Sequence, residues 1–342
     1  MRRYGYILGL AALLSFGGGD IDCSQWDSGL INIRDLSGFT YGGVNGGLWL
    51  DGSNDMPQVH IDTKPNPRRA SGDLVVATIG MSNARSYFCG NENQSASGDW
   101  DHLSLFGKLV ASPGLREDLV LINGARGGQT ATTWSKDYER PGWQLLDGKV
   151  QAAGLANEDI DVFLINLANV ENVESLPLPS PDASVYKLIE DLHEVIDLVM
   201  GRYPNVSRIY MIGREYGGYS TTYKSPEPFA YESNFAAKHV ILDRLGTLPW
   251  VTWGPDIWTN GLVGREWDGF AQPCEHFEID GIHPTDPGMD AISDIMLEWF
   301  DANEPDLFFG SPCYETVHLL DYLADPAFTV VGLLDILANW CP

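Results

Sequence analysis

Three short stretches of the chain carry residue types that together could cleave an ester. Ser82 follows a run of β-forming residues that ends at Gly80, and Asp280 and His283 stand three residues apart in the turn-like segment 278–288. A serine hydroxyl is a weak nucleophile until a neighbouring base takes its proton, and the base is usually oriented by a carboxylate. The spacing lets Asp280 fold back onto one nitrogen of His283, which leaves the other nitrogen free to face Ser82.

A third stretch, NGARGGQT at 123–130, contains two consecutive glycines. Glycine pairs permit unusual backbone angles and close approach, and a peptide N–H from such a turn can stabilise a developing oxyanion. Each stretch also has a purely structural interpretation. The segment 123–130 could be an ordinary turn, and 278–288 could be a solvated turn that leads into a helix.

The elements that would position these residues can be read from the apolar pattern. Short, continuous apolar runs are typical of strands buried on both faces of a parallel sheet. They occur at 74–79, 118–123, 161–168 and 208–213, with a shorter candidate at 250–253. Helical periods occur at 184–203, 235–248 and 288–300. This alternation predicts an α/β domain over 71–303 with right-handed crossovers.

Polar or glycine-rich residues follow four of the predicted strands. They are Ser82, residues 124–128, residues 169–172 and Arg214. In open parallel sheets, ligands bind outside the carboxyl ends of the strands. We therefore expect these residues to share one rim of the sheet.

The motifs GxSN, xGGQT and DxxHP, taken together, resemble those of the SGNH (GDSL-like) hydrolases over residues 72–300. The GxSN form is similar to carbohydrate-esterase branches, and the chain looks like uncharacterised exported bacterial members. The resemblance implies a flavodoxin-like three-layer α/β/α fold with a mostly parallel sheet of about five strands. It also implies hydrolysis of acyl esters, with acetyl esters of a carbohydrate favoured, and no cofactor or metal.

The resemblance also implies a role for each matching residue. Ser82 matches the nucleophile, His283 the base and Asp280 the residue that orients the base. Gly128 matches the oxyanion-hole glycine, with Gly127 as the fallback if the turn shifts by one residue. The backbone N–H of Ser82 would be a further donor.

One motif departs from the family pattern. The family has GxND after the third strand, whereas INLANVENV places Ala168 on the glycine and Val170 on the asparagine. A valine side chain has no hydrogen-bond donor, and the loss of one oxyanion donor typically costs about 100- to 1000-fold in rate. We prefer Asn169, one residue early, as the replacement donor, and Asn172 is the alternative.

Two arginines and several tryptophans lie near the predicted site. Arg85 and Arg126 could bind an acidic group of the substrate, but structural salt bridges in this acidic protein are the favoured interpretation. Tryptophans in or near the loops could stack on sugar rings, although core packing is the default. They are Trp100, Trp134, Trp143, Trp253 and Trp258.

Three other functions compete with this interpretation. An α/β-hydrolase would need GxSxG, but Ala84 occupies the last position. A metal-dependent phosphoesterase would need clustered ligands, for which four residues are close in sequence. They are His276, Glu278, Asp280 and His283. A non-catalytic glycan-binding protein on the same scaffold is favoured by Val170.

The two ends of the chain differ from the predicted domain. Residues 1–19 have two arginines, an apolar stretch and small residues, which is typical of a signal peptide. Residues 20–70 are rich in loop formers, and 304–342 predict a small helical tail. We expect a secreted or periplasmic protein with no membrane span in the mature chain. Its oligomeric state is left open.

Charge and cysteine content set further limits. With 21 Lys and Arg against 47 Asp and Glu, the net charge of −26 argues against a nucleic-acid partner. The five cysteines leave at least one unpaired, and export permits disulfides. Their connectivity is open. Cys313 with Cys341 would tie down the tail, and Cys89 with Cys274 would join two loops.

Overall fold

The computed structural model describes residue 21 and residues 23–66, 72–90, 100–136, 139–171, 174–220 and 226–309. The predicted signal peptide, most of the predicted tail and Asn172 lie outside these residues. Within the described part of the chain, no helix has the length and apolarity needed to cross a membrane.

A five-stranded parallel sheet forms the centre of the molecule, with the strand order β4-β3-β5-β6-β7. The strands are β3 (Leu74–Gly80), β4 (Leu119–Asn123), β5 (Val162–Asn166), β6 (Arg208–Ile212) and β7 (Trp250–Trp253). Every residue of β3, β5, β6 and β7 is buried, as the continuous apolar runs predicted. The predicted α/β fold class is confirmed.

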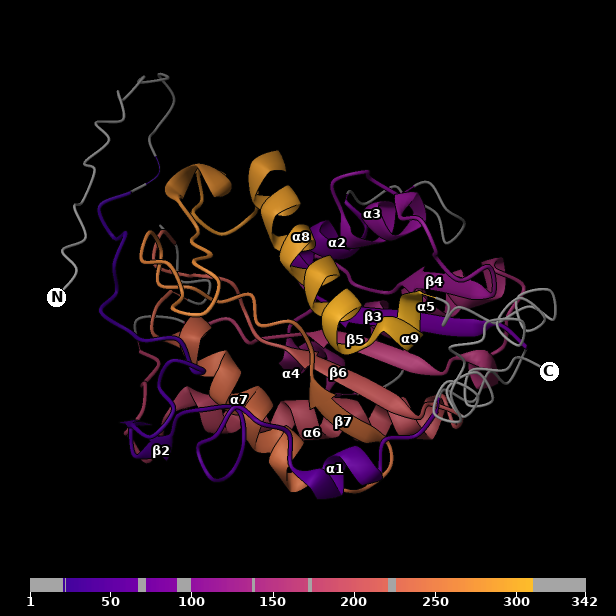
Figure 1. The fold of residues 1–342 in the computed structure, drawn as a ribbon, viewed down its shortest axis with the longest axis horizontal. Coiled ribbons are helices and arrows are strands. Elements are labelled where there is room, and N and C mark those ends of the chain that lie inside the picture. The colour runs from indigo at the N-terminus through magenta and orange to yellow at the C-terminus, as the bar shows by residue number, and fades with distance from the viewer. Residues whose placement is uncertain are drawn as a thin grey trace, which may run out of the picture.

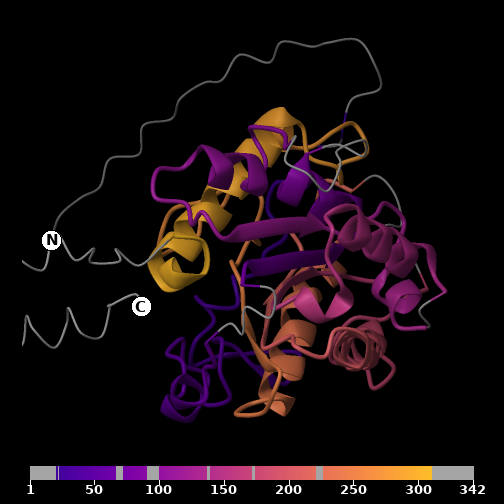
Figure 2. The same cartoon turned by 90° about the vertical axis from the view of Figure 1, so that its right-hand side faces the viewer.

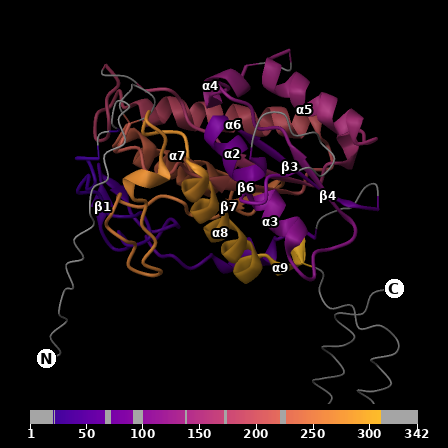
Figure 3. The ribbon, with the colours of Figure 1, turned by 90° about the horizontal axis from the view of Figure 1, so that it is seen from above.

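Helices cover both faces of this sheet, which gives three layers (Figures 1 and 2). One layer contains α2 (Ser82–Cys89), α3 (Leu105–Ala111), α8 (Asp286–Asn303) and α9 (Pro305–Phe308). The other contains α4 (Ala131–Trp134), α5 (Pro141–Ala152), α6 (Ser184–Arg202) and α7 (Phe229–Asp243). Figure 3 shows the two layers separated by the sheet.

Alternate residues of β3 divide the core between these two layers. Val75, Ala77 and Ile79 belong to one apolar cluster with residues of α5, α6 and α7. Leu74 and Val76 belong to a second cluster with residues of α2, α3 and α8. Successive side chains of a strand point to opposite faces, so a strand that serves two layers must be apolar throughout.

Two predicted helices differ in their boundaries. The predicted helix 235–248 is α7, which begins at Phe229 and ends at Asp243, where Gly246 (φ 71°) lies in the turn that follows. The predicted helix 288–300 is α8, which begins at Asp286. Its cap is Thr285, so Pro287 lies inside the first turn, where a missing N–H costs nothing.

Residues 23–66 contribute β1 (Thr40–Tyr41), β2 (Val44–Asn45) and α1 (Gln58–Asp62), with loops between them. They pack against the α/β domain. The Lys238 ammonium donates to three consecutive carbonyls, of residues 45, 46 and 47. Trp250 of β7 donates its indole N–H to the His60 carbonyl at 2.9 Å. The segment is therefore fastened along the β7 side of the molecule.

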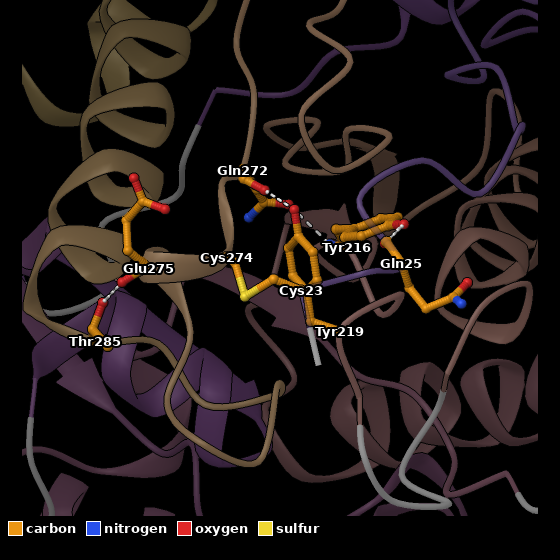
Figure 4. Close-up of a disulfide and its surroundings, with 8 residues drawn as sticks. All are labelled: Cys23, Gln25, Tyr216, Tyr219, Gln272, Cys274, Glu275 and Thr285. Atoms are coloured by element: carbon orange, nitrogen blue, oxygen red, sulfur yellow. Dashed lines mark hydrogen bonds between the residues drawn. A yellow bond between two sulfur atoms is a disulfide. The ribbon is translucent and has the colours of Figure 1, made fainter. Parts of the chain in front are cut away.

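A disulfide joins Cys23 to Cys274, with 5.6 Å between their Cα atoms (Figure 4). The suggested pairing of Cys89 with Cys274 is wrong. Cys89 is a buried thiol at the end of α2, where its sulfur accepts a hydrogen bond from the Asn123 amide. Burial of its side chain in the core against the sheet keeps it from Cys274. Cys313 and Cys341 lie outside the described residues.

Candidate active site

Ser82, His283 and Asp280 form a continuous chain of hydrogen bonds. The Nδ1 atom of His283 lies 2.6 Å from Asp280 Oδ2, and its Nε2 atom lies 2.8 Å from Ser82 Oγ. An ionised carboxylate can only accept, so the imidazole proton is on Nδ1. Nε2 therefore accepts the Ser82 hydroxyl proton, which is the arrangement that activates a serine.

The turn from β3 into α2 places Ser82. It is the first residue of that helix, and Met81 precedes it as the N-cap residue without a capping side chain. The first amides of a helix have no partner within the helix, and the helix dipole favours negative charge at this end. Oxygen that becomes negatively charged at Ser82 is therefore stabilised by the element that carries it.

The loop that carries His283 is held by its own carboxylate. Asp280 Oδ1 accepts the backbone N–H groups of Ile282 and His283, each at 3.0 Å. Gly281 between them has φ 66°, and a Cβ at this position would overlap the Tyr219 carbonyl. Only glycine readily adopts this positive φ and also lacks the Cβ that would overlap the carbonyl. This turn holds the imidazole and the carboxylate together.

The segment before this loop is anchored as well (Figure 4). Tyr219 donates its hydroxyl to the Gln272 carbonyl at 3.0 Å, and Cys274 carries the disulfide to Cys23. Just after the loop, Thr285 donates its hydroxyl to the Glu275 carbonyl at 2.7 Å. The loop is therefore fixed on both sides of His283.

The electrostatics of Asp280 suit this role. Burial raises its pKa, but the backbone N–H and imidazole of His283 and the amide of Ile282 lower it more, so the net direction is downward. The carboxylate is therefore ionised at neutral pH, and in this state it accepts the Nδ1 proton of His283 and can stabilise a positively charged imidazole.

Asn83 joins the serine to the histidine loop, a role that the sequence analysis missed. Its amide nitrogen donates to the Ile282 carbonyl at 2.7 Å and to Glu215 Oε1. Its oxygen lies 3.3 Å from Ser82 Oγ. The signal in the sequence was the polar residue directly after the candidate nucleophile in GxSN. That residue is buried, so it must have found internal partners.

Gly128 lies at the same site. Gly127 and Gly128 line the cavity that contains Ser82 and His283, and Gly128 has φ 74°. Among the described residues, its N–H has no hydrogen-bond acceptor. The bond from the Ala131 N–H to the Ala168 carbonyl, at 3.0 Å, ties the end of this loop to the chain that leaves β5. The loop therefore offers a backbone donor in the cavity that contains Ser82.

The structure contradicts the expectation that Asn169 supplies the side-chain oxyanion donor. Its amide nitrogen donates to Asp191 Oδ2 at 2.8 Å, and its oxygen accepts the Thr132 N–H at 2.8 Å. Asp191 also accepts from Lys187 and from Ser135. Asn169 is thus part of a network that ties α4 to α6, and it does not line the cavity.

Val170, which the gapless alignment places on the asparagine of the family motif, is part of the cavity wall. It lines the cavity and 46% of its surface is exposed. Asn172 lies outside the described residues.

The cavity has a volume of about 340 Å³. Of the two arginines proposed as substrate-binding residues, Arg85 lines it, whereas Arg126 does not and donates to the Pro141 carbonyl at 3.0 Å. Arg214, which follows β6, also lines the cavity. It was predicted to reach this rim of the sheet, but it was not recognised as a substrate-binding candidate.

The four residues considered as metal ligands do not converge. Among the described residues, no three of His276, Glu278, Asp280 and His283 form a group that could hold a metal ion, although Asp280 and His283 are in contact. A different group does: His193, His239 and Asp243, on α6 and α7, have ligand atoms within 4.8 Å of one another. Asp243 Oδ2 lies 3.1 Å from a nitrogen of each imidazole, so hydrogen bonds already account for this cluster.

The tryptophans near the loops are core residues, as the default interpretation held. Four are at most 5% exposed, namely Trp134, Trp143, Trp253 and Trp258. Trp100 is partly buried and packs against Phe106, with the ring centres 5.1 Å apart. These five side chains therefore offer little surface for stacking on a sugar.

No known family model matches the chain. Solved structures with a similar fold include a GDSL-like lipase candidate from Parabacteroides merdae, with 16% identity, TM-score 0.42 and coverage of 67% of this chain and 95% of that one. A carbohydrate esterase family 3 protein from Talaromyces cellulolyticus shares 12% identity, with TM-score 0.42 and coverage of 68% and 99%. An extracellular lipase from Streptomyces rimosus shares 16% identity, with TM-score 0.35 and coverage of 66% and 99%.

These similarities are remote and concern the overall fold. What the neighbours act on is a property of those proteins, and the function of this chain has to be argued from its own residues.

Proposed function

We propose that the protein is a serine hydrolase of carboxylic esters. The observation that supports this function is the chain of hydrogen bonds from Ser82 through His283 to Asp280, with distances of 2.8 and 2.6 Å. Ser82 lies in the wall of a cavity that Gly128 also lines, and the Gly128 N–H has no acceptor within the part of the chain that the structure describes.

In the first step, Ser82 Oγ attacks the ester carbonyl carbon while His283 Nε2 takes the hydroxyl proton. The oxyanion of the tetrahedral intermediate accepts the backbone N–H groups of Gly128 and Ser82. Asp280 stabilises the imidazolium. The bond from carbon to the leaving oxygen then breaks, and His283 returns the proton to that oxygen, which leaves as an alcohol.

The second step releases the acyl group from Ser82. His283 Nε2 takes a proton from water, whose oxygen attacks the acyl carbon, and the same two N–H groups again hold the oxyanion. The bond to Ser82 Oγ breaks, His283 protonates that oxygen, and the carboxylic acid leaves. Proton balance is restored, and the proposal is supported by Ser82, His283 and Gly128 lining one cavity.

We further propose that the physiological substrate is an acetyl ester on a carbohydrate and that the protein acts outside the cytoplasm. The substrate rests on the similarity of GxSN to carbohydrate-esterase motifs. Export is supported by the signal-like pattern of residues 1–19 and by the Cys23–Cys274 disulfide, a bond typical of oxidising compartments.

A fluorophosphonate probe, which reacts with activated serines, tests the central proposal. We expect labelling of the wild type and of Ser86→Ala, a matched control one turn further along α2. Ser82→Ala and His283→Ala should not be labelled. Equal labelling of Ser82→Ala would refute the assignment. Acetate release from a panel of acetylated sugars, compared with p-nitrophenyl esters, then tests the substrate.

The non-catalytic alternative keeps one observation in its favour, Val170 in place of a donor. It predicts binding of a glycan by a wild-type protein that neither reacts with the probe nor releases acetate. Burial of four of the five loop tryptophans weakens it, because little aromatic surface is left for sugar rings.

A further inference from the structure

The cavity at Ser82 differs in charge from the rest of the protein. The chain carries 47 acidic against 21 basic residues. Yet Arg85 and Arg214 both line the cavity, and among the described residues no aspartate or glutamate does. The described wall of this cavity is therefore positively charged in a protein whose net charge is strongly negative.

Arg214 is held in this wall by the fold. It follows β6, only 3% of its surface is exposed, and its backbone N–H donates to the Ser233 hydroxyl at 2.8 Å. Its guanidinium donates from Nη2 to Glu215 Oε1 at 2.6 Å. A buried arginine costs several kcal/mol of desolvation unless it is paired, and Glu215 supplies that partner.

The pairing leaves donors over. A guanidinium has five N–H groups in a rigid fork, and the buried Nε of Arg214 has no partner. Glu215 also accepts from Asn83, next to the nucleophile, so its charge is shared between two donors. The other carboxylate that interacts electrostatically with Arg214 is Glu227, which is itself bonded to Gly217, Tyr231 and Trp258.

Arg85 adds the second cation from a different element. It lies three residues after Ser82 on α2, almost one helical turn, and it is half-buried. Its side chain therefore reaches the cavity from the helix that carries the nucleophile, while Arg214 reaches it from the end of β6. Two guanidinium groups from separate elements suit a carboxylate, which they can bind in a bidentate manner.

We propose that Arg85 and Arg214 form an anion-binding subsite that selects ester substrates carrying a carboxylate, such as an acetylated uronic acid. This inference rests on the proposed ester hydrolysis and names the class of substrate. A hydrogen bond to a charged group contributes about 1.5–3 kcal/mol, so loss of one arginine should cost about 10- to 100-fold in kcat/KM for an acidic substrate.

The test compares an O-acetylated hexuronic acid with the corresponding O-acetylated hexose, which differs by the carboxylate. The wild type should prefer the acid by at least about tenfold in kcat/KM. Arg85→Gln should lose this preference, because its kcat/KM should fall further on the acid than on the neutral sugar. The matched control is Arg244→Gln, which removes the same charge at the end of α7, at a residue that does not line the cavity.

Arg214→Gln alone would leave Glu215 buried without its cation, which can prevent folding. The double variant Arg214→Gln/Glu215→Gln removes both charges and should fold and lose the preference as well. Equal wild-type rates on the two sugars would overturn the proposal. So would an equal loss on both sugars in the arginine variants while probe labelling of Ser82 persists.

Binding measured by calorimetry with Ser82→Ala separates this inference from the function itself. The acid should bind at least about tenfold more tightly than the neutral sugar, whether or not the wild type is an esterase. Absence of probe labelling with this binding preference intact would refute ester hydrolysis alone. Labelling without any binding preference would refute the anion subsite alone.

Discussion

The carboxyl ends of β3 and β5 are neighbours in the sheet, where Gly80 pairs with Asn166, yet they lead to different kinds of structure. After β3 the chain enters α2 directly and places Ser82 at the cavity, 2.8 Å from His283. After β5 the chain places Asn169 in a hydrogen-bond network with Asp191, and Val170 lies in the cavity wall. Two adjacent strand ends thus differ, since one carries the proposed nucleophile and the other mainly supports α4 and α6.

Asp280, which contacts His283, should affect activity, whereas Asp191, which holds Asn169, should affect stability. Replacing Asp280 with Asn should lower kcat by about 10,000-fold, because the carboxylate orients His283 and stabilises its charged form. Steady-state kinetics measure this change, and Asp286→Asn, an exposed residue at the start of α8, is the control. A loss of less than about tenfold would mean that the chain of hydrogen bonds is not catalytic.

Val170→Asn should raise kcat, because it adds a hydrogen-bond donor to the part of the cavity wall that follows β5. A full oxyanion donor is worth about 100- to 1000-fold, and a newly introduced amide should recover part of this, about tenfold in kcat. Val170→Leu, which adds bulk without a donor, should give no gain. If Asn and Leu have the same effect, this part of the wall does not face the oxyanion.

Asn169→Ala should change kcat by no more than about threefold, well short of the loss expected for an oxyanion donor. It should instead lower the free energy of unfolding by about 1–3 kcal/mol, because the Thr132 N–H and Asp191 lose a partner. Denaturant unfolding and kinetics on the same preparation measure both effects. A 100-fold loss of kcat in a protein of unchanged stability would restore Asn169 as a catalytic donor.

The Asp191 network should also show a pH dependence. Burial raises the pKa of Asp191, but hydrogen bonds from Lys187, Thr132, Asn169 and Ser135 lower it more, so its net direction is downward. The unfolded chain then binds more protons in acid than the folded chain, and this contribution is lost as the pH falls through the folded pKa. Asp191→Asn should therefore be less stable than wild type at pH 7, with the difference narrowing toward pH 3. A constant difference across this range would show that ionisation of Asp191 does not support the network.

Several features could be read from the sequence because they depend on neighbours along the chain. The strands came from apolar runs that a sheet with two covered faces requires. The contact of Asp280 with His283 came from a spacing of three residues, which a single turn around Gly281 can close. The helix α6, which begins at Ser184, was also predicted, because its apolar residues recur with the helical period.

Other features were decided by the tertiary structure. Cys23 meets Cys274 across 251 residues, and Asn169 finds Asp191 on α6 because helix packing brings that carboxylate to the end of β5. Arg214 reaches the cavity because Ser233 and Glu215 hold it there. In each case the partners are supplied by elements whose relative positions follow from packing of the whole core. The sequence by itself therefore determined the sheet and singled out Ser82, His283 and Asp280, and the packed fold decided which neighbouring side chains surround these three residues and which support the scaffold.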